Sequence, residues 1–441
     1  MTPAARLAAA IDLLDAIESA SRRPADAVAN DFFRARRYVG GGDRRAVSER
    51  VWGVLRRRLR LGWWLELVDA RPTARLLVAV DLLLAEGLDL PAVLRAFPGG
   101  QYAAEALNGP EERALRAIAG RRRAGGVLEH PGMSEAVRLE LPDWVLPGFR
   151  ARFGPRLGEE AAAMMAPAPL DLRANLLKTT RDGAATALAA EGIAAEPTPF
   201  SPWGLRVPER RPVTSTNAFQ EGLVEVQDEG SQLIALLTGA RPGMRVADYC
   251  AGAGGKTLAL AATMGNRGRL TACDVSTARL EGAVKRLRRA GVDNAERHLL
   301  EPGDRWAKRR AGAFDRVLVD APCTGTGTWR RNPDARTRTG PEDVRELLPK
   351  QAAILDAAAV LVRPKGGRLV YATCSLLPEE DEEQVRAFLG RHPDFAPLPL
   401  QAAWAEAGGS APPPGEGEFL LTTPARHGTD GFFAAILQRG P

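Results

Sequence analysis

The chain has 441 residues, of which 45% are hydrophobic and 26% are charged, and its formal net charge is +6. This length predicts two or three domains, and the hydrophobic content is ample for packed cores. No apolar run approaches the roughly 18 residues of a membrane-spanning helix, and the first residues lack the pattern of a secretory signal. We therefore expect a cytoplasmic protein without a membrane partner.

The cysteines and histidines argue against two kinds of scaffold. All four cysteines follow residue 249 without forming a Cys-x-x-Cys pair, and the four histidines are scattered along the chain. These positions disfavour both a disulfide framework and a zinc site. We expect no metal in this protein.

The N-terminal part of the chain has helical patterning. Apolar residues recur at helical spacing over residues 5–20 and again over residues 43–68, and residues 76–84 are apolar enough for a buried helix. Residues 121–132, which are rich in arginine and glycine, are typical of a linker. We predict an all-α N-terminal domain over residues 1–125.

A smaller segment of different character follows. Residues 172–177 alternate like a strand, and residues 182–191 are typical of a helix. Prolines between residues 197 and 208 then break the chain into short extended pieces. We expect residues 227–237 to form the helix that leads into the last domain. The strand, the helix and the short extended pieces together predict a small α+β module over residues 133–235.

Strand and helix patterns alternate through the rest of the chain. The expected strands cover residues 245–249, 269–273, 297–300, 315–320, 367–371 and 432–438. The expected helices cover residues 257–264, 277–290, 342–361 and 379–389. This βαβ rhythm is typical of a mostly parallel sheet with helices on both faces. We predict an α/β, Rossmann-like domain over residues 236–441.

A glycine-rich loop follows the first of these strands and opens a helix. It reads Asp248-Tyr249-Cys250-Ala251-Gly252-Ala253-Gly254-Gly255-Lys256-Thr257. Glycines let a backbone approach a ligand closely, and a helix N-terminus offers free N–H groups. A nucleoside-type cofactor fits this arrangement, with Asp274 at the end of the second strand for its ribose hydroxyls. A phosphate-binding P-loop is the alternative, although Cys250 stands where its first glycine belongs.

Two cysteines lie just beyond the ends of later strands. Cys323 follows Asp320 in an Asp-Ala-Pro-Cys sequence, and Cys374 lies in a Thr-Cys-Ser sequence. Residues beyond the carboxyl ends of parallel strands line the ligand crevice, and thiolates are strong nucleophiles. Two thiols and a carboxylate at this edge of the sheet indicate covalent chemistry. Either cysteine taken alone could equally be a small hydrophobic residue buried in the core.

The glycine loop and the two cysteine segments match three ordered motifs of one family. The motifs are Asp-x-Cys-Ala-x-x-Gly-Gly-Lys-Thr, Asp-Ala-Pro-Cys-Ser-Gly and Thr-Cys-Ser-x-x-Pro-Glu-Glu-Asn-Glu. In these segments the chain resembles the RNA cytosine-5 methyltransferases of the NOP/Sun family, and the likeness covers roughly residues 135–440. More weakly, the N-terminal helices resemble the NusB-type RNA-binding domain of the family's bacterial 16S ribosomal RNA members.

The resemblance implies a class I methyltransferase fold with S-adenosylmethionine as cofactor. It also implies that Cys374 adds to carbon 6 of a cytosine, and that Cys323 helps to remove the carbon 5 proton and eliminate the enzyme thiol. Asp320 would bind the cytosine edge, and Lys256 would lie near the reacting base or be structural. The residues expected to hold the cofactor are Cys250, Ala251, Gly252, Ala253, Gly254, Gly255, Lys256, Asp274 and Asp320, with Glu301 or Asp304 at the adenosine.

Two assignments stay open on the sequence. DNA cytosine-5 methyltransferases use a Pro-Cys thiol as nucleophile, which would give that role to Cys323, although the Thr-Cys-Ser sequence at Cys374 favours the RNA-type arrangement. The acidic residue after the third strand is either Glu301 or Asp304. The glycine loop also departs from the family, because Gly252-Ala253 replaces the usual Ala-Pro and should make the loop more flexible.

The expected partner is structured RNA, above all 16S ribosomal RNA, with transfer RNA and 23S ribosomal RNA as alternatives. Arg330 and Arg331 could bind phosphate, while Trp329 either stacks near the target base or packs in a core. An alternative function of a different class is an RNA-binding assembly factor with vestigial catalysis. The presence of both Cys323 and Cys374 argues against that alternative. Nothing in the sequence demands a dimer, so we expect a monomer.

Overall fold

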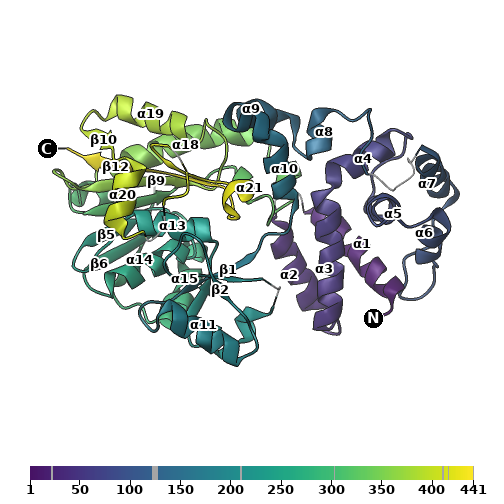
Figure 1. Cartoon of the computed structure of the whole chain (residues 1–441), viewed down its shortest axis with the longest axis horizontal. Coiled ribbons are helices and arrows are strands. Elements are labelled where there is room, and N and C mark those ends of the chain that lie inside the picture. Colours follow the sequence, from purple (N-terminus) through teal and green to yellow (C-terminus); the bar gives the residue numbers. More distant parts are fainter. Residues whose placement is uncertain are drawn as a thin grey trace. The chain divides into compact units, whose positions relative to one another are not determined.

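The computed structural model describes residues 1–20, 23–121, 128–208, 211–301, 303–409, 412–415 and 417–440. The chain divides into two compact units, each of which is coloured by sequence in Figure 1. The helical unit comprises Met1–Ala166 and Trp329–Gly340, and the sheet unit comprises Pro167–Thr328 and Pro341–Pro441. Of the predicted linker, residues 122–127 lie outside the described residues.

The helical unit packs its helices around one apolar core. Its elements are α1 (Pro3–Ser19), α2 (Ala25–Ala35), α3 (Gly41–Arg56), α4 (Arg58–Glu66), α5 (Ala74–Leu84), α6 (Leu90–Ala96), α7 (Gly109–Arg121), α8 (Glu135–Leu139), η1 (Asp143–Val145), α9 (Leu146–Phe153), η2 (Gly154–Arg156), α10 (Leu157–Met165) and α17 (Ala335–Arg338). Helix α1 begins where it does because the Thr2 hydroxyl accepts a hydrogen bond from Ala5 N at 3.2 Å. Its buried face packs against α2, α3 and α5.

The apolar periodicity over residues 43–68 forms two helices rather than one. Helix α3 ends at Arg56 and α4 begins at Arg58, because Arg57 leaves the helical backbone region with φ −104° and ψ 16°. The Arg57 guanidinium donates two hydrogen bonds, of 2.7 and 3.1 Å, to the buried carboxylate of Asp81. Periodicity alone did not predict this break, since both helices present apolar faces to the same core.

The segment Trp329–Gly340 belongs to the helical unit, although the chain on either side of it belongs to the sheet unit. Trp329 is 0% exposed, and its ring lies 5.9 Å from that of Phe149. Arg330 is only 4% exposed, and Arg331 is half-buried. Of the two alternatives for Trp329, packing in a core is confirmed, because its ring is fully buried. The expectation that Arg330 binds phosphate is wrong, because its side chain is buried as well.

Two side chains of this segment bind the backbone of the helical unit. Asp334 accepts a hydrogen bond from Ala25 N at 3.1 Å, at the start of α2. Arg336 donates to the carbonyl oxygens of Arg56 at 3.2 Å and Met164 at 2.8 Å, at the ends of α3 and α10. These buried bonds satisfy helix-terminal groups that have no partner within their own helices.

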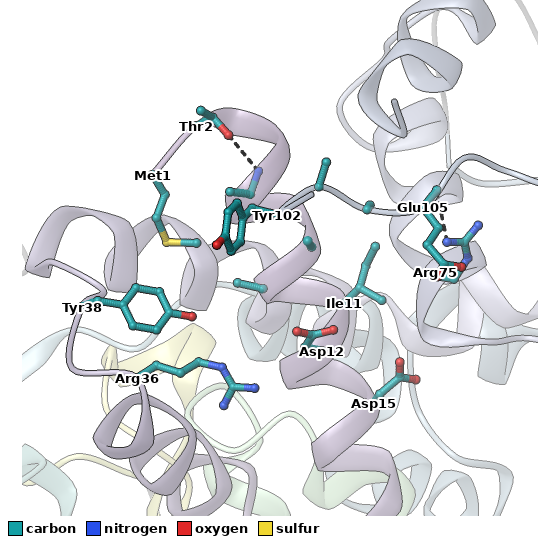
Figure 2. A pocket seen from close by; sticks show the side chains of 15 residues that line it. Met1, Thr2, Ile11, Asp12, Asp15, Arg36, Tyr38, Arg75, Tyr102 and Glu105 are labelled. Carbon is teal, nitrogen blue, oxygen red and sulfur yellow. Dashed lines mark hydrogen bonds between the residues drawn. The ribbon is translucent and has the colours of Figure 1, made fainter. Parts of the chain in front are cut away.

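A pocket of about 740 Å³ opens on the α1 side of the helical unit (Figure 2). Alanines form part of its wall, and the exposed rings of Tyr38 and Tyr102 lie at its rim. The carboxylates of Asp12 and Asp15 also line it. Burial, and then the neighbouring Asp12, raise the pKa of Asp15. Arg36 and Arg75 line the same pocket, so its charge is mixed and we assign no ligand to it.

The sheet unit begins with a four-stranded antiparallel sheet in the order β2-β3-β1-β4. Its elements are β1 (Leu170–Ala174), α11 (Arg181–Ala190), β2 (Glu196–Pro197), β3 (Gly204–Val207), η3 (Val213–Ser215), α12 (Asn217–Gln220) and β4 (Val224–Val226). The strand and helix predicted at residues 172–177 and 182–191 correspond to β1 and α11. Strand β2 is short and ends at Pro197, since proline has no backbone N–H to donate to a ladder.

The second sheet has the strand order β10-β12-β9-β8-β5-β6-β7, with β11 paired to β12. Strands β5 to β9 run parallel, whereas β12 is antiparallel to β9, β10 and β11. The strands are β5 (Arg245–Asp248), β6 (Arg269–Asp274), β7 (Ala295–Leu299), β8 (Arg316–Asp320), β9 (Arg368–Thr373), β10 (Phe395–Pro397), β11 (Leu420–Thr422) and β12 (Phe432–Arg439). The prediction of a mostly parallel, Rossmann-like sheet is confirmed.

Helices cover both faces of this sheet (Figure 1). They are α13 (Glu229–Leu237), α14 (Gly255–Met264), α15 (Thr277–Ala290), α16 (Trp306–Arg309), η4 (Thr326–Thr328), α18 (Pro341–Ala359), α19 (Glu382–Arg391), α20 (Leu400–Ala407) and α21 (Pro424–His427). Along β8, Val317 and Val319 join the core under α18 and α19, while Leu318 joins the core under α13 and α14. Within the described ranges, no helix is long and apolar enough to cross a membrane.

Candidate active site

The parallel strands deliver the predicted site residues to one edge of the larger sheet. Strands β9, β8, β5 and β6 are neighbours in that order, so their carboxyl ends lie side by side. These ends carry Asp320 on β8, Asp248 on β5 and Asp274 on β6, and Cys374 follows β9 directly. Polar groups at the carboxyl ends of neighbouring parallel strands share one ligand crevice.

The two thiols that were predicted to act together are in contact. The sulfur atoms of Cys323 and Cys374 are 3.4 Å apart, although the residues are 51 positions apart in the chain. Both side chains are half-buried. The hydrogen bond with Cys374, and then burial, raise the pKa of the Cys323 thiol well above its usual value. Cys323 therefore keeps its proton at neutral pH.

A buried carboxylate fixes the loop that carries Cys323. Glu380 is 0% exposed and accepts hydrogen bonds from the Thr324 hydroxyl and from Thr324 N, the latter at 2.9 Å. Gln351 donates to the same carboxylate at 2.9 Å and to the carbonyl oxygen of Pro322 at 3.0 Å. The residues on both sides of Cys323 are thus held in place. In the sequence, only the position of Glu380 in the third family motif indicated that it belongs to the site.

A second set of hydrogen bonds fixes Cys374. The Thr373 hydroxyl donates to Asp381 at 2.6 Å and accepts from Ser375 N at 3.2 Å. The Cys374 carbonyl oxygen accepts a hydrogen bond from Gly327 N at 2.9 Å. This last bond joins the loop of Cys374 to the end of the loop of Cys323, so the backbones that carry the two thiols are directly connected.

Lys256 and Asp320 form an ion pair beside the thiols. Lys256 Nζ lies 2.6 Å from Asp320 Oδ2, and the lysine is only 8% exposed. Burial lowers the pKa of Lys256, but the attraction of Asp320 outweighs burial and the pKa is raised. The lysine is therefore charged, and it fixes the orientation of Asp320. About a third of the Asp320 side chain, 31%, remains exposed for a ligand.

The glycine loop curls around the N-terminus of α14. Gly254 caps this helix in the left-handed region with φ 81°, and Gly252 has φ 54°, so both positions need a backbone that favours glycine. Gly252 N donates to Asp274 Oδ2 at 2.9 Å, and Ser276 N donates to Asp274 Oδ1 at 2.8 Å. Asp274 therefore ties the loop to the end of β6.

The buried carboxylate of Asp248 bears on whether a nucleoside-type cofactor fits this loop. It is 0% exposed, and its Oδ2 accepts a hydrogen bond from the Thr257 hydroxyl at 2.7 Å. Its Oδ1 is buried without a hydrogen-bond partner. Burial raises the pKa of Asp248 to about 7. An unsatisfied acceptor beside a glycine loop and a strand-end carboxylate suits a ligand that carries both amino and hydroxyl donors.

The remaining predicted site residues, and Cys273 at the end of β6, have more local roles. Burial, as the largest cause, raises the pKa of the thiols of Cys250 and Cys273, so both stay protonated. Asp304 binds His298 Nε2 at 2.6 Å and accepts from Trp306 N at 2.8 Å, and the hydrogen bond with His298 lowers its pKa. Glu301 is exposed. In the part of the chain that the structure describes, no three His, Cys, Asp or Glu side chains group as metal ligands.

The fold and this strand-end site define a Rossmann-like, S-adenosylmethionine-dependent methyltransferase. Residues 235–438 match the family described as 16S rRNA methyltransferase RsmB/F, and residues 141–214 match a family described as the RsmF/B-like ferredoxin-like domain. The chain belongs to the RsmB/F family. The alternative of a phosphate-binding P-loop is wrong, and S-adenosylmethionine is the cofactor.

Individual relatives extend this similarity over most of the chain. A probable ribosomal RNA small subunit methyltransferase B from Synechocystis sp. is 34% identical over 90% of this chain and 91% of its own. Ribosomal RNA small subunit methyltransferase B from Salmonella newport is 32% identical over the same shares of both chains, 90% and 91%. The crystal structure of a methyltransferase homologue from Pyrococcus horikoshii, 29% identical, covers 70% of this chain and 100% of its own with a TM-score of 0.59.

Proposed function

We propose that this protein transfers a methyl group to carbon 5 of a cytosine in small-subunit ribosomal RNA, through a covalent bond between Cys374 and carbon 6 of the base. The observation that carries the proposal is the 3.4 Å contact between the sulfurs of Cys323 and Cys374 at the carboxyl edge of the sheet. Such chemistry needs two groups at one place, because the base that removes the ring proton must act while the nucleophile is still attached.

Cys374 is the nucleophile in this proposal. Carbon 5 of cytosine is itself a poor nucleophile, and addition of a thiolate to carbon 6 converts the ring into an enamine. Bound S-adenosylmethionine supplies the electrophilic methyl group for the enamine carbon. The Cys323 sulfur lies 3.4 Å from the Cys374 sulfur, so both thiols can act on the same ring.

Cys323 is the base that completes the reaction. Its pKa is raised first by the hydrogen bond with Cys374, and that cause disappears once the Cys374 sulfur is bonded to the ring. Cys323 is only half-buried, so it can then give its proton to solvent water at the stage where a base is needed. The Cys323 thiolate takes the carbon 5 proton, the electrons of that bond form the carbon 5–carbon 6 double bond, and Cys374 leaves as a thiolate.

Asp320 and Lys256 would serve the base itself. Addition at carbon 6 favours a protonated ring nitrogen, and a carboxylate aimed at that edge stabilises it. Asp320 is suited to this role because it stays partly exposed while Lys256 holds one of its oxygens at 2.6 Å. Lys256 is a positioning residue here. Asp248, Asp274 and the backbone from Cys250 to Gly255 would hold the cofactor, with Glu301 or Asp304 at the adenosine.

The RNA substrate is proposed from the relatives, which are named as ribosomal RNA small subunit methyltransferases. The target cytosine must leave any base stack to reach Cys374, at a cost of about a few kcal/mol that is least in an unpaired loop. An accessible, single-stranded cytosine of 16S ribosomal RNA is therefore the proposed target. Transfer RNA and 23S ribosomal RNA are the substrates to compare with it.

The test uses wild type, Cys374→Ala and Cys323→Ala with unmodified ribosomal RNA and S-adenosylmethionine. Methyl incorporation and a denaturing gel for protein–RNA adducts are the two measurements. We expect Cys374→Ala to be inactive without an adduct, and Cys323→Ala to accumulate a covalent RNA complex because the elimination step has lost its base. Mapping the methyl group by mass spectrometry of nucleosides identifies 5-methylcytosine.

Two results would contradict the proposal in different ways. An adduct in Cys374→Ala, together with complete loss of activity in Cys323→Ala, would exchange the roles of the two thiols. Failure of the wild type to methylate 16S, 23S or transfer RNA would instead favour an RNA-binding assembly factor. Methylation of 23S or transfer RNA alone would leave the chemistry in place and change the substrate.

A further inference from the structure

A loop near the C-terminus, residues 428–431, touches the loops of both thiols. Gly431 N donates to the carbonyl oxygen of Gly327 at 2.8 Å, and Gly327 N donates to the carbonyl oxygen of Cys374 at 2.9 Å. The two glycines approach so closely that a Cβ atom on Gly327 would lie 2.2 Å from Gly431 O. No side chain fits between them, so a shift of residues 428–431 must displace the backbone at Gly327.

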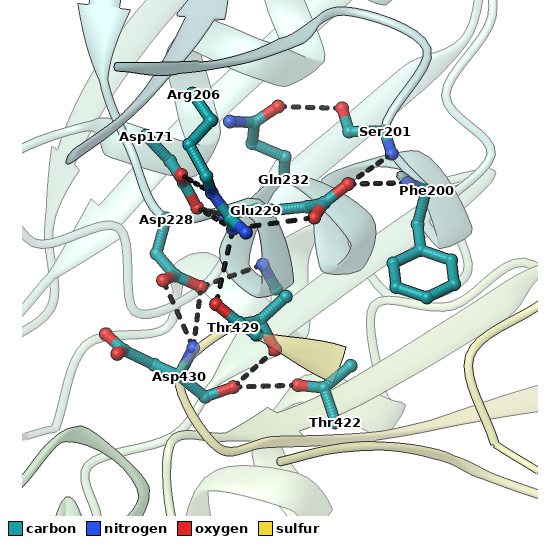
Figure 3. A network of polar contacts seen from close by, with 12 residues as sticks. Asp171, Phe200, Ser201, Arg206, Asp228, Glu229, Gln232, Thr422, Thr429 and Asp430 are labelled. Atoms are coloured by element: carbon teal, nitrogen blue, oxygen red, sulfur yellow. Dashed lines mark hydrogen bonds and ion pairs between the residues drawn. The ribbon is translucent and has the colours of Figure 1, made fainter. Parts of the chain in front are cut away.

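Two side chains far away in sequence hold this C-terminal loop in place (Figure 3). Asp430 N donates to both carboxylate oxygens of Asp228, at 3.1 and 3.3 Å. Asp228 is also the N-cap of α13, where it accepts a hydrogen bond from Gly230 N at 2.8 Å. Arg206 donates to the carbonyl oxygen of Gly428 at 3.3 Å. The loop is therefore bound at both of its ends by charged groups.

Arg206 is itself fixed by a buried carboxylate. Asp171 on β1 is 1% exposed and accepts two hydrogen bonds from Arg206, at 2.7 and 2.9 Å (Figure 3). The same carboxylate accepts from Glu229 N at 3.2 Å, at the start of α13. A bidentate pair of this kind sets the direction of a guanidinium as well as its position. The antiparallel sheet thus supplies a rigid anchor for the C-terminal loop.

We propose that Arg206 and Asp228 are positioning residues of the active site, which fix the spacing of the Cys323 and Cys374 thiols through residues 428–431 and Gly327. The inference rests on the proposed function in that it takes these thiols as the reacting pair. It assigns the small antiparallel sheet a part in catalysis, although neither residue contacts a thiol. Thiol geometry matters because displacing a reacting group by about 1 Å costs about a hundredfold in rate.

The test compares Asp228→Asn, Arg206→Gln and Arg206→Lys with wild type in the full-length protein. Asparagine still caps a helix, so Asp228→Asn retains α13 but loses one of the two acceptors for Asp430 N. Lysine keeps the charge of Arg206 but cannot donate to Asp171 and Gly428 in the same geometry. Glu225→Gln is the matched control, because Glu225 belongs to the same antiparallel sheet and pairs instead with Arg289, at 2.6 Å, and with Arg286, at 3.5 Å.

Two readouts separate positioning from general damage. One is methyl transfer to RNA, for which we expect kcat to fall by about a hundredfold in Arg206→Gln with little change in KM. The other is the rate at which diamide oxidises the two thiols to a disulfide, since that reaction requires close sulfurs and involves no RNA. We expect slower oxidation in Asp228→Asn and Arg206→Gln, an intermediate rate in Arg206→Lys, and the wild-type rate in Glu225→Gln.

Disulfide formation at the wild-type rate in both Asp228→Asn and Arg206→Gln would overturn the proposal. Equal slowing in Glu225→Gln would also overturn it, because the effect would then be general loosening of the sheet. If the wild type transfers no methyl group to any RNA while the variants still oxidise slowly, the proposed function fails and the positioning of the thiols stands. Unchanged binding of S-adenosylhomocysteine shows that each variant is folded.

Discussion

At the scale of single residues, the site separates three carboxylates by their surroundings. Asp320 faces a lysine at 2.6 Å, Asp274 accepts two backbone N–H groups, and Asp248 is wholly buried with one unsatisfied oxygen. The sequence predicted that all three carboxylates lie at strand ends, but not how deeply each one is buried or which groups it contacts. Burial disfavours the charged form of Asp248 and raises its pKa to about 7.

The raised pKa of Asp248 predicts a pH-dependent effect on stability. Its folded pKa is about 7, above the value of 3.8 expected in the unfolded chain. Between these values the folded state binds the extra proton, so stability falls as pH rises from about 4 to about 7 and then levels off. A shift of this size corresponds to at most about 4 kcal/mol. Asp248→Asn should remove this loss, so its stability relative to wild type should increase across that pH window.

Unfolding in urea at several pH values, in the absence of cofactor, checks this expectation. The control is Asp182→Asn, which neutralises an exposed carboxylate in the same unit. A constant difference between Asp248→Asn and wild type from pH 4 to pH 8 would mean that Asp248 is ionised in the folded protein.

At the scale of elements, local pattern predicted most helices and strands but not their exceptions. The helix predicted at residues 379–389 begins only at Glu382, because Glu380 and Asp381 are used to fix the loops of the two thiols. The segment Trp329–Gly340 is the larger exception, since it leaves the sheet unit and packs among helices. No periodicity in so short a segment could have predicted that partner.

The role of this segment gives a prediction for Arg336. Its guanidinium is 3% exposed and satisfies the carbonyl oxygens of Arg56 and Met164. Burial lowers its pKa to about 10, so it remains charged at neutral pH. Arg336→Met leaves both carbonyl groups unsatisfied and should weaken the helical unit by about 2 kcal/mol. Arg345→Met is the control, since Arg345 is largely exposed and pairs with Glu342, which is exposed as well.

Hydrogen exchange resolved by mass spectrometry measures the loss of stability in the helical unit peptide by peptide. A single melting curve would combine the unfolding of both units. Peptides of α2, α3 and α10 should exchange faster in Arg336→Met, by a factor that corresponds to the lost stability. If those peptides exchange as in wild type, the segment does not contribute to holding the helices together.

At the scale of the whole molecule, the two compact units divide the chain after Ala166, with Trp329–Gly340 assigned to the first unit. The sequence suggested three domains, over residues 1–125, 133–235 and 236–441, and that division stays a prediction, as does a monomeric state. The residues proposed to hold the cofactor all belong to the sheet unit. Binding there stabilises the folded state by mass action without requiring any change in the helical unit.

Ligand binding should therefore be visible as a shift in melting temperature. S-adenosylhomocysteine at about a hundredfold its Kd stabilises the folded state by about 2.7 kcal/mol. For a unit of this size, that energy should raise the melting temperature by several degrees, about 2–4 °C per kcal/mol. ATP with magnesium should cause no shift. Asp274→Asn should reduce the shift, because Asp274 ties down the glycine loop, and an undiminished shift would remove Asp274 from the cofactor site.

The sequence by itself determined the α/β architecture, the order of strand and helix, and the delivery of Asp248, Asp274, Asp320 and both thiols to strand ends. Those features depend on local physics, namely apolar periodicity and the backbone freedom of glycine. Only the tertiary structure decided that Cys323 and Cys374 touch and that Trp329 is buried. It also decided that Asp228 reaches Asp430, 202 residues away. Such contacts follow from how distant segments pack together, and no local pattern encodes them.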